Sequence, residues 1–94
     1  MVHFLVRHKV KDYTKWKPVF DAHAAKRKEN GSRGGRLFRN TKDPNEVLIL
    51  FEWDDVGKGR RFAESEELRQ AMERAGVSDK PDLYFLEEIE KFAG

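Results

Sequence analysis

Cysteine is absent from all 94 residues of the chain. This absence excludes disulfides, thiolate nucleophiles, cysteine zinc sites and cysteine-ligated iron–sulfur clusters, and it fits a reducing compartment. Long hydrophobic runs are missing as well, since no apolar stretch approaches the roughly 20 residues that a membrane span needs. The first residues, MVHFLVRHKVKD, carry charge too early for a signal or transit peptide. We therefore expect a soluble cytoplasmic protein without a membrane partner.

Patterns that bind metals or phosphates are also scarce. The three histidines, His3, His8 and His23, have no HxH or HxxxH spacing, so no metal site is expected. The stretch GSRGGR lacks the glycine spacing of a phosphate-binding loop and is predicted to be a flexible turn. We expect neither a metal nor another cofactor.

What the chain does contain is charge and aromatic residues. Hydrophobic and charged residues each make up 38%, and seven Phe, two Trp and two Tyr are too many for a disordered segment. The length suits a single domain, residues 1–94. Residues 1–47 hold 12 Lys and Arg against 5 Asp and Glu, whereas residues 48–94 hold 7 against 12. This asymmetry fits either a surface for a polyanion or the complementary faces of a dimer.

Periodicity predicts a strand and a helix in the first third of the chain. Residues 2–10 alternate between two faces, as a strand does. Asp12 can cap a helix that runs to about Asn30, where Asn30 and Gly31 supply a stop. Because proline lacks an N–H, we expect Pro18 to kink this helix or to leave a separate first turn at 12–17.

The remainder predicts a hairpin, a broken helix and a last strand. The polar turn TKDPN is flanked by two predicted strands, GGRLFRN (34–40) and EVLILFEWD (46–54). The second strand is apolar on both faces at its centre, as in a central strand of a sheet. Residues 55–75 have a helical pattern with a new N-cap near Ser65, and residues 82–90 form a final strand.

The resulting βαββαβ order predicts an α+β fold of ferredoxin-like topology, with a four-stranded antiparallel sheet and the helices on one face. The strands are expected in the order fourth, first, third, second. The other face carries Leu5, Leu48 and Leu50, together with Tyr84 and Leu86 or with Leu83 and Phe85, depending on register. An apolar sheet face needs cover, so we expect a homodimer through the sheet faces.

The strand end FEWDD and the stretch RFAESEELRQAMERAGV, within the βαββαβ order, resemble the antibiotic biosynthesis monooxygenase-like proteins of the dimeric α/β-barrel superfamily. The resemblance covers residues 2–90 approximately. It implies a dimeric α/β barrel with a pocket between sheet and helices in each subunit. Relatives include cofactor-independent monooxygenases of polycyclic aromatic phenols, haem-degrading enzymes and aromatic cyclases. Met72 stands where the haem-degrading relatives have an iron-binding histidine, so haem degradation is not expected.

Three polar residues are candidates for chemistry, and each also has a structural explanation. His23 can take a proton from a phenol in an aromatic pocket, near Trp53, or it can bond a backbone carbonyl. His8 is the alternative base, near Tyr13 and Trp16, or a buried structural residue. Arg27 can stabilise a substrate oxyanion, or it belongs to a solvated run. The expected substrate-binding residues are Trp16, Phe20, Phe51, Trp53, Phe62 and Met72.

The sequence thus predicts a small cofactor-independent monooxygenase-like or cyclase-like enzyme for an aromatic or polyketide-like molecule. The alternative is a noncatalytic dimer that binds a small apolar ligand or serves a stress-related role. RNA-recognition modules share the βαββαβ order, but their third strand carries a basic, glycine-containing aromatic run that EVLILFEWD lacks. No nucleic-acid partner is therefore expected.

Overall fold

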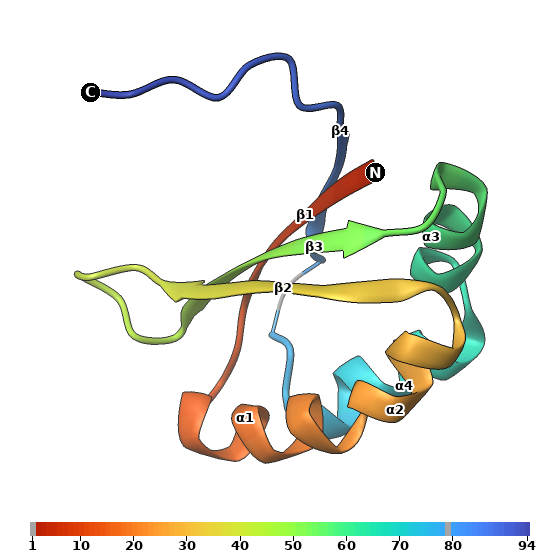
Figure 1. Cartoon of the computed structure of the whole chain (residues 1–94). Coiled ribbons are helices and arrows are strands. Elements are labelled where there is room, and N and C mark those ends of the chain that lie inside the picture. Colours follow the sequence, from red (N-terminus) through yellow and green to blue (C-terminus); the bar gives the residue numbers. More distant parts are fainter. Residues whose placement is uncertain (1, 79) are drawn as a thin grey trace.

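The computed structural model, which describes residues 2–78 and 80–94, contains a four-stranded antiparallel sheet with helices on one face (Figure 1). The strand order is β2-β3-β1-β4, which confirms the predicted ferredoxin-like topology. The elements in chain order are β1 (Val2–Lys9), α1 (Tyr13–Ala22), α2 (Ala24–Glu29), β2 (Ser32–Arg39), β3 (Glu46–Trp53), α3 (Val56–Ala63), α4 (Glu66–Ala75) and β4 (Asp82–Leu86).

Local capping explains where most of the helices begin and end. The Asp12 carboxylate accepts a hydrogen bond from the Thr14 N–H (3.0 Å), as expected for the N-cap of α1. The Ser65 hydroxyl accepts from the Leu68 N–H (3.1 Å) at the start of α4, and this cap confirms the predicted break near residue 65. Gly76, with a φ of 78°, ends α4 in the left-handed conformation that glycine tolerates.

The separate first turn predicted at 12–17 is wrong. α1 runs through Pro18 without a separate first turn, and the break between α1 and α2 falls at His23 instead. The physical reason lies in the last turn of α1. The Phe20 carbonyl accepts hydrogen bonds from the His23 N–H (3.3 Å) and from Arg27 Nη1 (2.7 Å). A side chain from α2, seven residues further along the chain, therefore satisfies a carbonyl at the C-terminal end of α1.

Two predictions on the strands also need correction. GSRGGR is not a flexible turn: β2 begins at Ser32, with a bulge between Ser32 and Gly34. The last strand ends at Leu86 rather than at residue 90. Because Leu86 pairs with His3, one residue from the start of β1, the chain beyond it has no neighbouring strand to pair with. Residues 87–94 run away from the helices, on the opposite side of the sheet (Figure 1).

The core lies between the sheet and the helices. Along β3, Val47, Ile49, Phe51 and Trp53 are buried on the helix side. Phe4 of β1 pairs with Phe85 of β4, and their rings stack with centroids 4.8 Å apart. This pairing resolves the register that the sequence left open.

The opposite face, called here the open face, includes the side chains that alternate with this core. Leu5 pairs there with Leu50 on one side and with Tyr84 on the other. Leu86 lies on the same face, since it pairs with His3. The open face is therefore partly apolar, as predicted.

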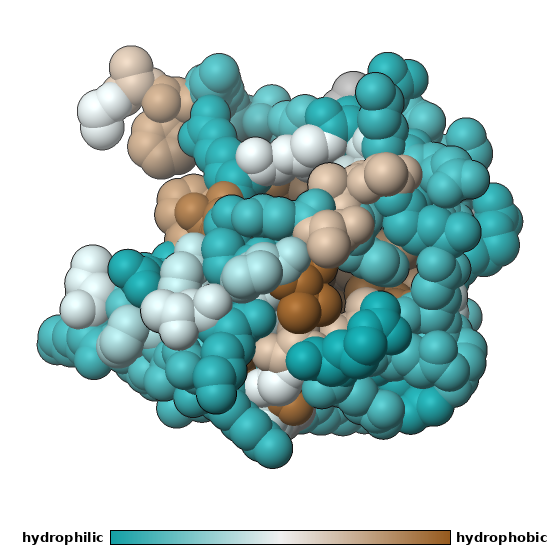
Figure 2. Space-filling model, turned by 90° about the horizontal axis from the view of Figure 1, so that it is seen from below, coloured by the Kyte–Doolittle hydropathy of each residue, from teal (hydrophilic) through white to brown (hydrophobic). Residues whose placement is uncertain are grey.

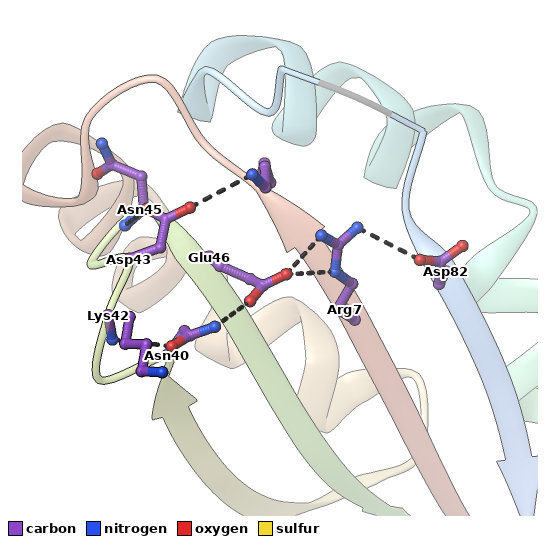
Figure 3. A network of polar contacts seen from close by, with 8 residues as sticks. Arg7, Asn40, Lys42, Asp43, Asn45, Glu46 and Asp82 are labelled. Atoms are coloured by element: carbon purple, nitrogen blue, oxygen red, sulfur yellow. Dashed lines mark hydrogen bonds and ion pairs between the residues drawn. The ribbon is translucent and has the colours of Figure 1, made fainter.

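A network of polar contacts joins three strands at one end of the open face (Figure 3). Arg7 of β1 donates from Nε to Glu46 of β3 (2.8 Å) and from Nη1 to Asp82 of β4 (3.4 Å). Asn40 Nδ2 also donates to Glu46 (2.6 Å). The hydrogen bonds from Asn40 and Arg7 lower the pKa of the Glu46 carboxyl. The Arg7–Asp82 pair shows that the basic first half and the acidic second half of the chain neutralise each other in part within one chain.

Candidate functional site

An apolar pocket lies between the helices and the sheet, where the resemblance predicted one. Its volume is about 90 Å³, several times the roughly 10–15 Å³ that a single water requires. Hydrophobic side chains are visible in an opening of the otherwise hydrophilic helix side (Figure 2). The pocket is lined by eight of the nine predicted site residues: His8, Trp16, Phe20, His23, Arg27, Phe51, Phe62 and Met72.

His23 occupies the break between α1 and α2 and lines the pocket from there. Its ring lies beside Phe62, with centroids 5.8 Å apart. Nε2 is buried and has no hydrogen-bond partner among the described residues. Burial, and then the positive charge of Arg27, lower the pKa of His23 below its ordinary value of 6.5. The imidazole is therefore neutral at pH 7.

Arg27 lies one turn beyond His23 and holds a fixed position. Its Nη1 donates to the Phe20 carbonyl (2.7 Å), and its Cζ lies 3.9 Å from the centroid of the Phe20 ring. These contacts combine a hydrogen bond with a cation–π interaction. Burial lowers the pKa of Arg27, and the charge of Asp21 opposes this. An arginine remains cationic at neutral pH, so the pocket has one fixed positive group beside its neutral histidine.

His8 reaches the same pocket from β1. It is buried, and its ring makes an edge contact with Trp16 at a centroid distance of 5.6 Å. Trp16 in turn stacks on Phe20 at 4.9 Å. His8 thus lies at the Trp16 side of the pocket, as the sequence predicted, whereas His23 lies at the Phe62 side.

Trp53 is the one predicted site residue that does not line the pocket. Its side chain is completely buried, with Phe62 5.1 Å away and Phe4 and Phe51 each 6.5 Å away between ring centroids. Phe62, rather than Trp53, supplies the aromatic contact to His23. Trp53 therefore supports the pocket wall from behind and belongs to the core.

Sequence reasoning missed part of the wall. Leu68 of α4 and Pro81 and Leu83 around the start of β4 also line the pocket. Leu83 pairs with Val6 on the helix side of the sheet. The sequence left the register of the last strand open, and a choice of register would have decided whether Leu83 lies on that side. Pro81 precedes the strand and carried no pattern that pointed to the pocket.

Residues 2–78 and 80–94 contain neither a three-residue cluster of potential metal ligands nor a helix that could cross a membrane. Within these ranges no three His, Asp or Glu side chains gather as a metal would require. None of the helices described there has both the length and the apolar character needed to cross a membrane.

Several solved structures share this fold at low sequence identity. SnoaB from Streptomyces nogalater, a cofactor-independent oxygenase solved as a variant, is 18% identical with a TM-score of 0.76, and the match covers 99% of this chain and 97% of that one. A candidate antibiotic biosynthesis monooxygenase from Caulobacter crescentus is 18% identical with a TM-score of 0.74, covering 95% and 90%. Another from Deinococcus radiodurans is 20% identical with a TM-score of 0.67, covering all of both chains.

Among curated proteins, none matches the chain significantly. The family model for antibiotic biosynthesis monooxygenase, however, matches residues 2–74. The match spans β1 through most of α4, and therefore every element of the pocket except the start of β4. The chain belongs to the antibiotic biosynthesis monooxygenase family.

Proposed function

We propose that this monooxygenase-like chain oxygenates a small aromatic or polyketide-like molecule in the apolar pocket without a cofactor, with His23 as the base. The observation that carries the proposal is His23, which lines the pocket with its ring beside Phe62 and whose buried Nε2 has no hydrogen-bond partner among the described residues. Such a nitrogen is costly to bury unless a ligand satisfies it. Family membership supports the same class of reaction.

The chemistry requires little more than a base and a water-poor cavity. Neutral His23 takes a proton from an acidic phenol or from the CH₂ group of its keto form. The resulting carbanion-like substrate passes electrons to O₂, and a C–O bond forms to give a peroxide. The peroxide takes back the proton and loses water to leave a ketone, so that CH₂ and O₂ become C=O and H₂O. Arg27 stabilises the substrate oxyanion during these steps.

The test is oxygen uptake with a panel of phenols, quinols and anthrones, compared between the unmodified chain and His23→Gln. We expect at least a 100-fold loss of turnover, since general bases contribute roughly 10²–10⁴-fold, with retained binding of the aromatic compound. His3→Gln is the matched control, because His3 lies on the open face and does not line the pocket. Unchanged turnover in His23→Gln would remove His23 as the base.

His8→Gln distinguishes the two histidines. If His8 is the base, this variant rather than His23→Gln loses turnover. Activity that depends on His23 should persist at pH 6.5 and fall only on the acidic side of it, because burial and the charge of Arg27 lower the His23 pKa below that ordinary value. Ligand binding without oxygen uptake for any compound would favour the noncatalytic binder.

We also propose that a second copy of the chain covers the open face. Tyr84 and Leu86 are 53% and 41% exposed there, and Ile89 and Phe92 of the C-terminal segment are 85% and 79% exposed. This segment lies on the open side of the sheet (Figure 1). Apolar surface of this extent is buried in most proteins by a partner.

Light scattering tests the dimer, and a mass twice that of one chain is expected. Leu50→Lys should give the mass of a single chain, because Leu50 is at the centre of the open face. Glu52→Lys is the control, since it puts the same residue type on the same strand and face without removing apolar surface. A single-chain mass for the unmodified protein would contradict the proposal.

A further inference from the structure

A second, more open cavity lies outside the apolar pocket, between α2 and the start of β2. Its volume is about 610 Å³, and it is lined by Ala24, Arg27, Lys28, Ser32, Arg33 and Gly34. We call it the outer groove. Half of its six residues are cationic and none is acidic.

A third cavity borders both this groove and the aromatic pocket. It measures about 170 Å³ and shares Ser32 and Gly34 with the outer groove, and Phe20 and Phe51 with the pocket. Arg27 lines all three spaces. The Arg27 guanidinium therefore stands at the boundary between an apolar interior and a basic exterior.

Two of the groove cations form no ion pair with a described residue, although the charge of Asp21 acts on Arg27. Arg33 pairs with Asp54, but Arg27 and Lys28 form no ion pair within the part of the chain that the structure describes. Arg27 uses Nη1 for the Phe20 carbonyl, which leaves other N–H donors of its fork for an oxygen ligand. Cations at the end of a helix can simply complement its dipole. Here they also line one cavity together, and Arg27 lines the aromatic pocket as well.

We propose that the substrate is an aromatic acid whose ring enters the apolar pocket while its carboxylate stays in the outer groove between Arg27 and Lys28. The inference rests on the proposed function, because it assumes that the substrate ring occupies the apolar pocket. It adds to that function that the substrate carries an acidic substituent. A carboxylate suits this place because arginine offers parallel N–H donors in a planar fork and lysine adds a second charge. The bulge in β2 and the exposed Gly34, whose Cβ position meets no atom within 4 Å, leave room for the group.

Binding of such an acid also has a consequence for His23. The Arg27 charge is one of the causes that lower the His23 pKa, so a carboxylate on Arg27 offsets it. The acid should therefore raise the His23 pKa on binding, whereas a neutral analogue should not. This shift can be followed by NMR from the His23 ring protons and does not depend on turnover.

The experiment compares 4-hydroxyphenylacetate with 4-hydroxyphenylacetamide, which share a ring and differ in charge. Calorimetric titration should give roughly tenfold tighter binding of the acid, as one charge-assisted contact at a partly exposed site provides. Lys28→Met should abolish most of this preference. Lys26→Met is the matched control, because Lys26 is two residues away on the same helix but pairs with Glu29 and Glu67 and does not line the groove.

Each outcome decides the matter. Equal affinities for the acid and the amide would overturn the inference. An equal loss of the acid preference in Lys28→Met and Lys26→Met would also overturn it, because such a result would reflect only the general positive field of the helix. Acetate that binds as tightly as the aromatic acid would also overturn it, because the ring would then contribute nothing. An acid preference without oxygen uptake for any compound would leave the groove assignment intact and count against the proposed function alone.

Discussion

Strand β2 approaches β3 so closely at Gly35 that the structure leaves no room for a side chain. A Cβ atom there would lie 2.2 Å from the Leu50 carbonyl oxygen and 2.9 Å from the Phe51 Cα. Both are backbone atoms of β3, so they cannot rotate away as the end of a side chain can. Gly35→Ala therefore forces β2 to move away from β3 at the point where Gly35 pairs with Phe51.

The cost follows from what this movement breaks. About two backbone hydrogen bonds are lost or stretched, at about 1 kcal/mol each, and the strain of a forced side chain adds about 1 kcal/mol or more. We expect the free energy of unfolding to fall by about 3 kcal/mol, a large part of the roughly 5–15 kcal/mol that domains possess. Urea unfolding, followed by circular dichroism with m-values compared between variants, measures this change.

Gly59→Ala is the matched control, and it should act in the opposite direction. A Cβ at Gly59 meets Phe85 Cε1 at 3.4 Å, an ordinary contact distance. Gly59 lies inside α3, where alanine is favoured over glycine by roughly 0.5–1 kcal/mol. If Gly35→Ala leaves the stability unchanged, or if both variants change it in the same direction, the close approach of β2 to β3 is refuted.

Two further predictions concern a helix cap and a histidine. Ser65→Ala should lower the free energy of unfolding by about 1 kcal/mol, because the Ser65 hydroxyl accepts a hydrogen bond from the Leu68 N–H and donates one to the Phe62 carbonyl. Ser65→Thr should recover most of this loss, as measured by urea unfolding. Equal stability of the unmodified chain and both variants would refute the cap. The folded-state pKa of His23 is lowered by burial and by Arg27, Arg74 and Lys26, against Glu67. Its contribution to stability is therefore complete above the ordinary pKa of 6.5 and is lost as the pH falls through the folded pKa. The stability difference between the unmodified chain and His23→Gln should shrink on that acidic side, and a difference independent of pH would contradict the shift.

The ends of the helices were predictable because their signals are local. Asp12, Ser65 and Gly76 act on backbone groups within a few residues, so the sequence alone contains the whole interaction. The separate turn expected before Pro18 was wrong because the cost of one missing N–H does not decide whether the surrounding helix persists. The break at His23 involves a hydrogen bond from Arg27 to a carbonyl seven residues earlier, which no residue propensity reports.

The ends of the strands were less predictable because a strand ends where its partner does. Residues 87–90 continue a strand-like pattern, yet Leu86 already pairs with His3 near the start of β1. The same limit applies to the site. Helical spacing was enough to put His23 and Arg27 together, whereas the depth of Trp53 beneath Phe62 depends on how the layers pack.

Arg27 has two physical roles that cannot be separated by changing Arg27 itself. Its side chain satisfies the Phe20 carbonyl at the end of α1, and its backbone N–H bonds the His23 carbonyl (3.1 Å). The same anchoring keeps a positive charge near the His23 ring, where it favours the neutral imidazole. An Arg27 variant would change the local fold and the pKa of the candidate base at once. Lys28 faces the same groove, and none of the hydrogen bonds that hold this break involves its side chain, so a change in ligand charge preference in Lys28→Met reports on binding alone.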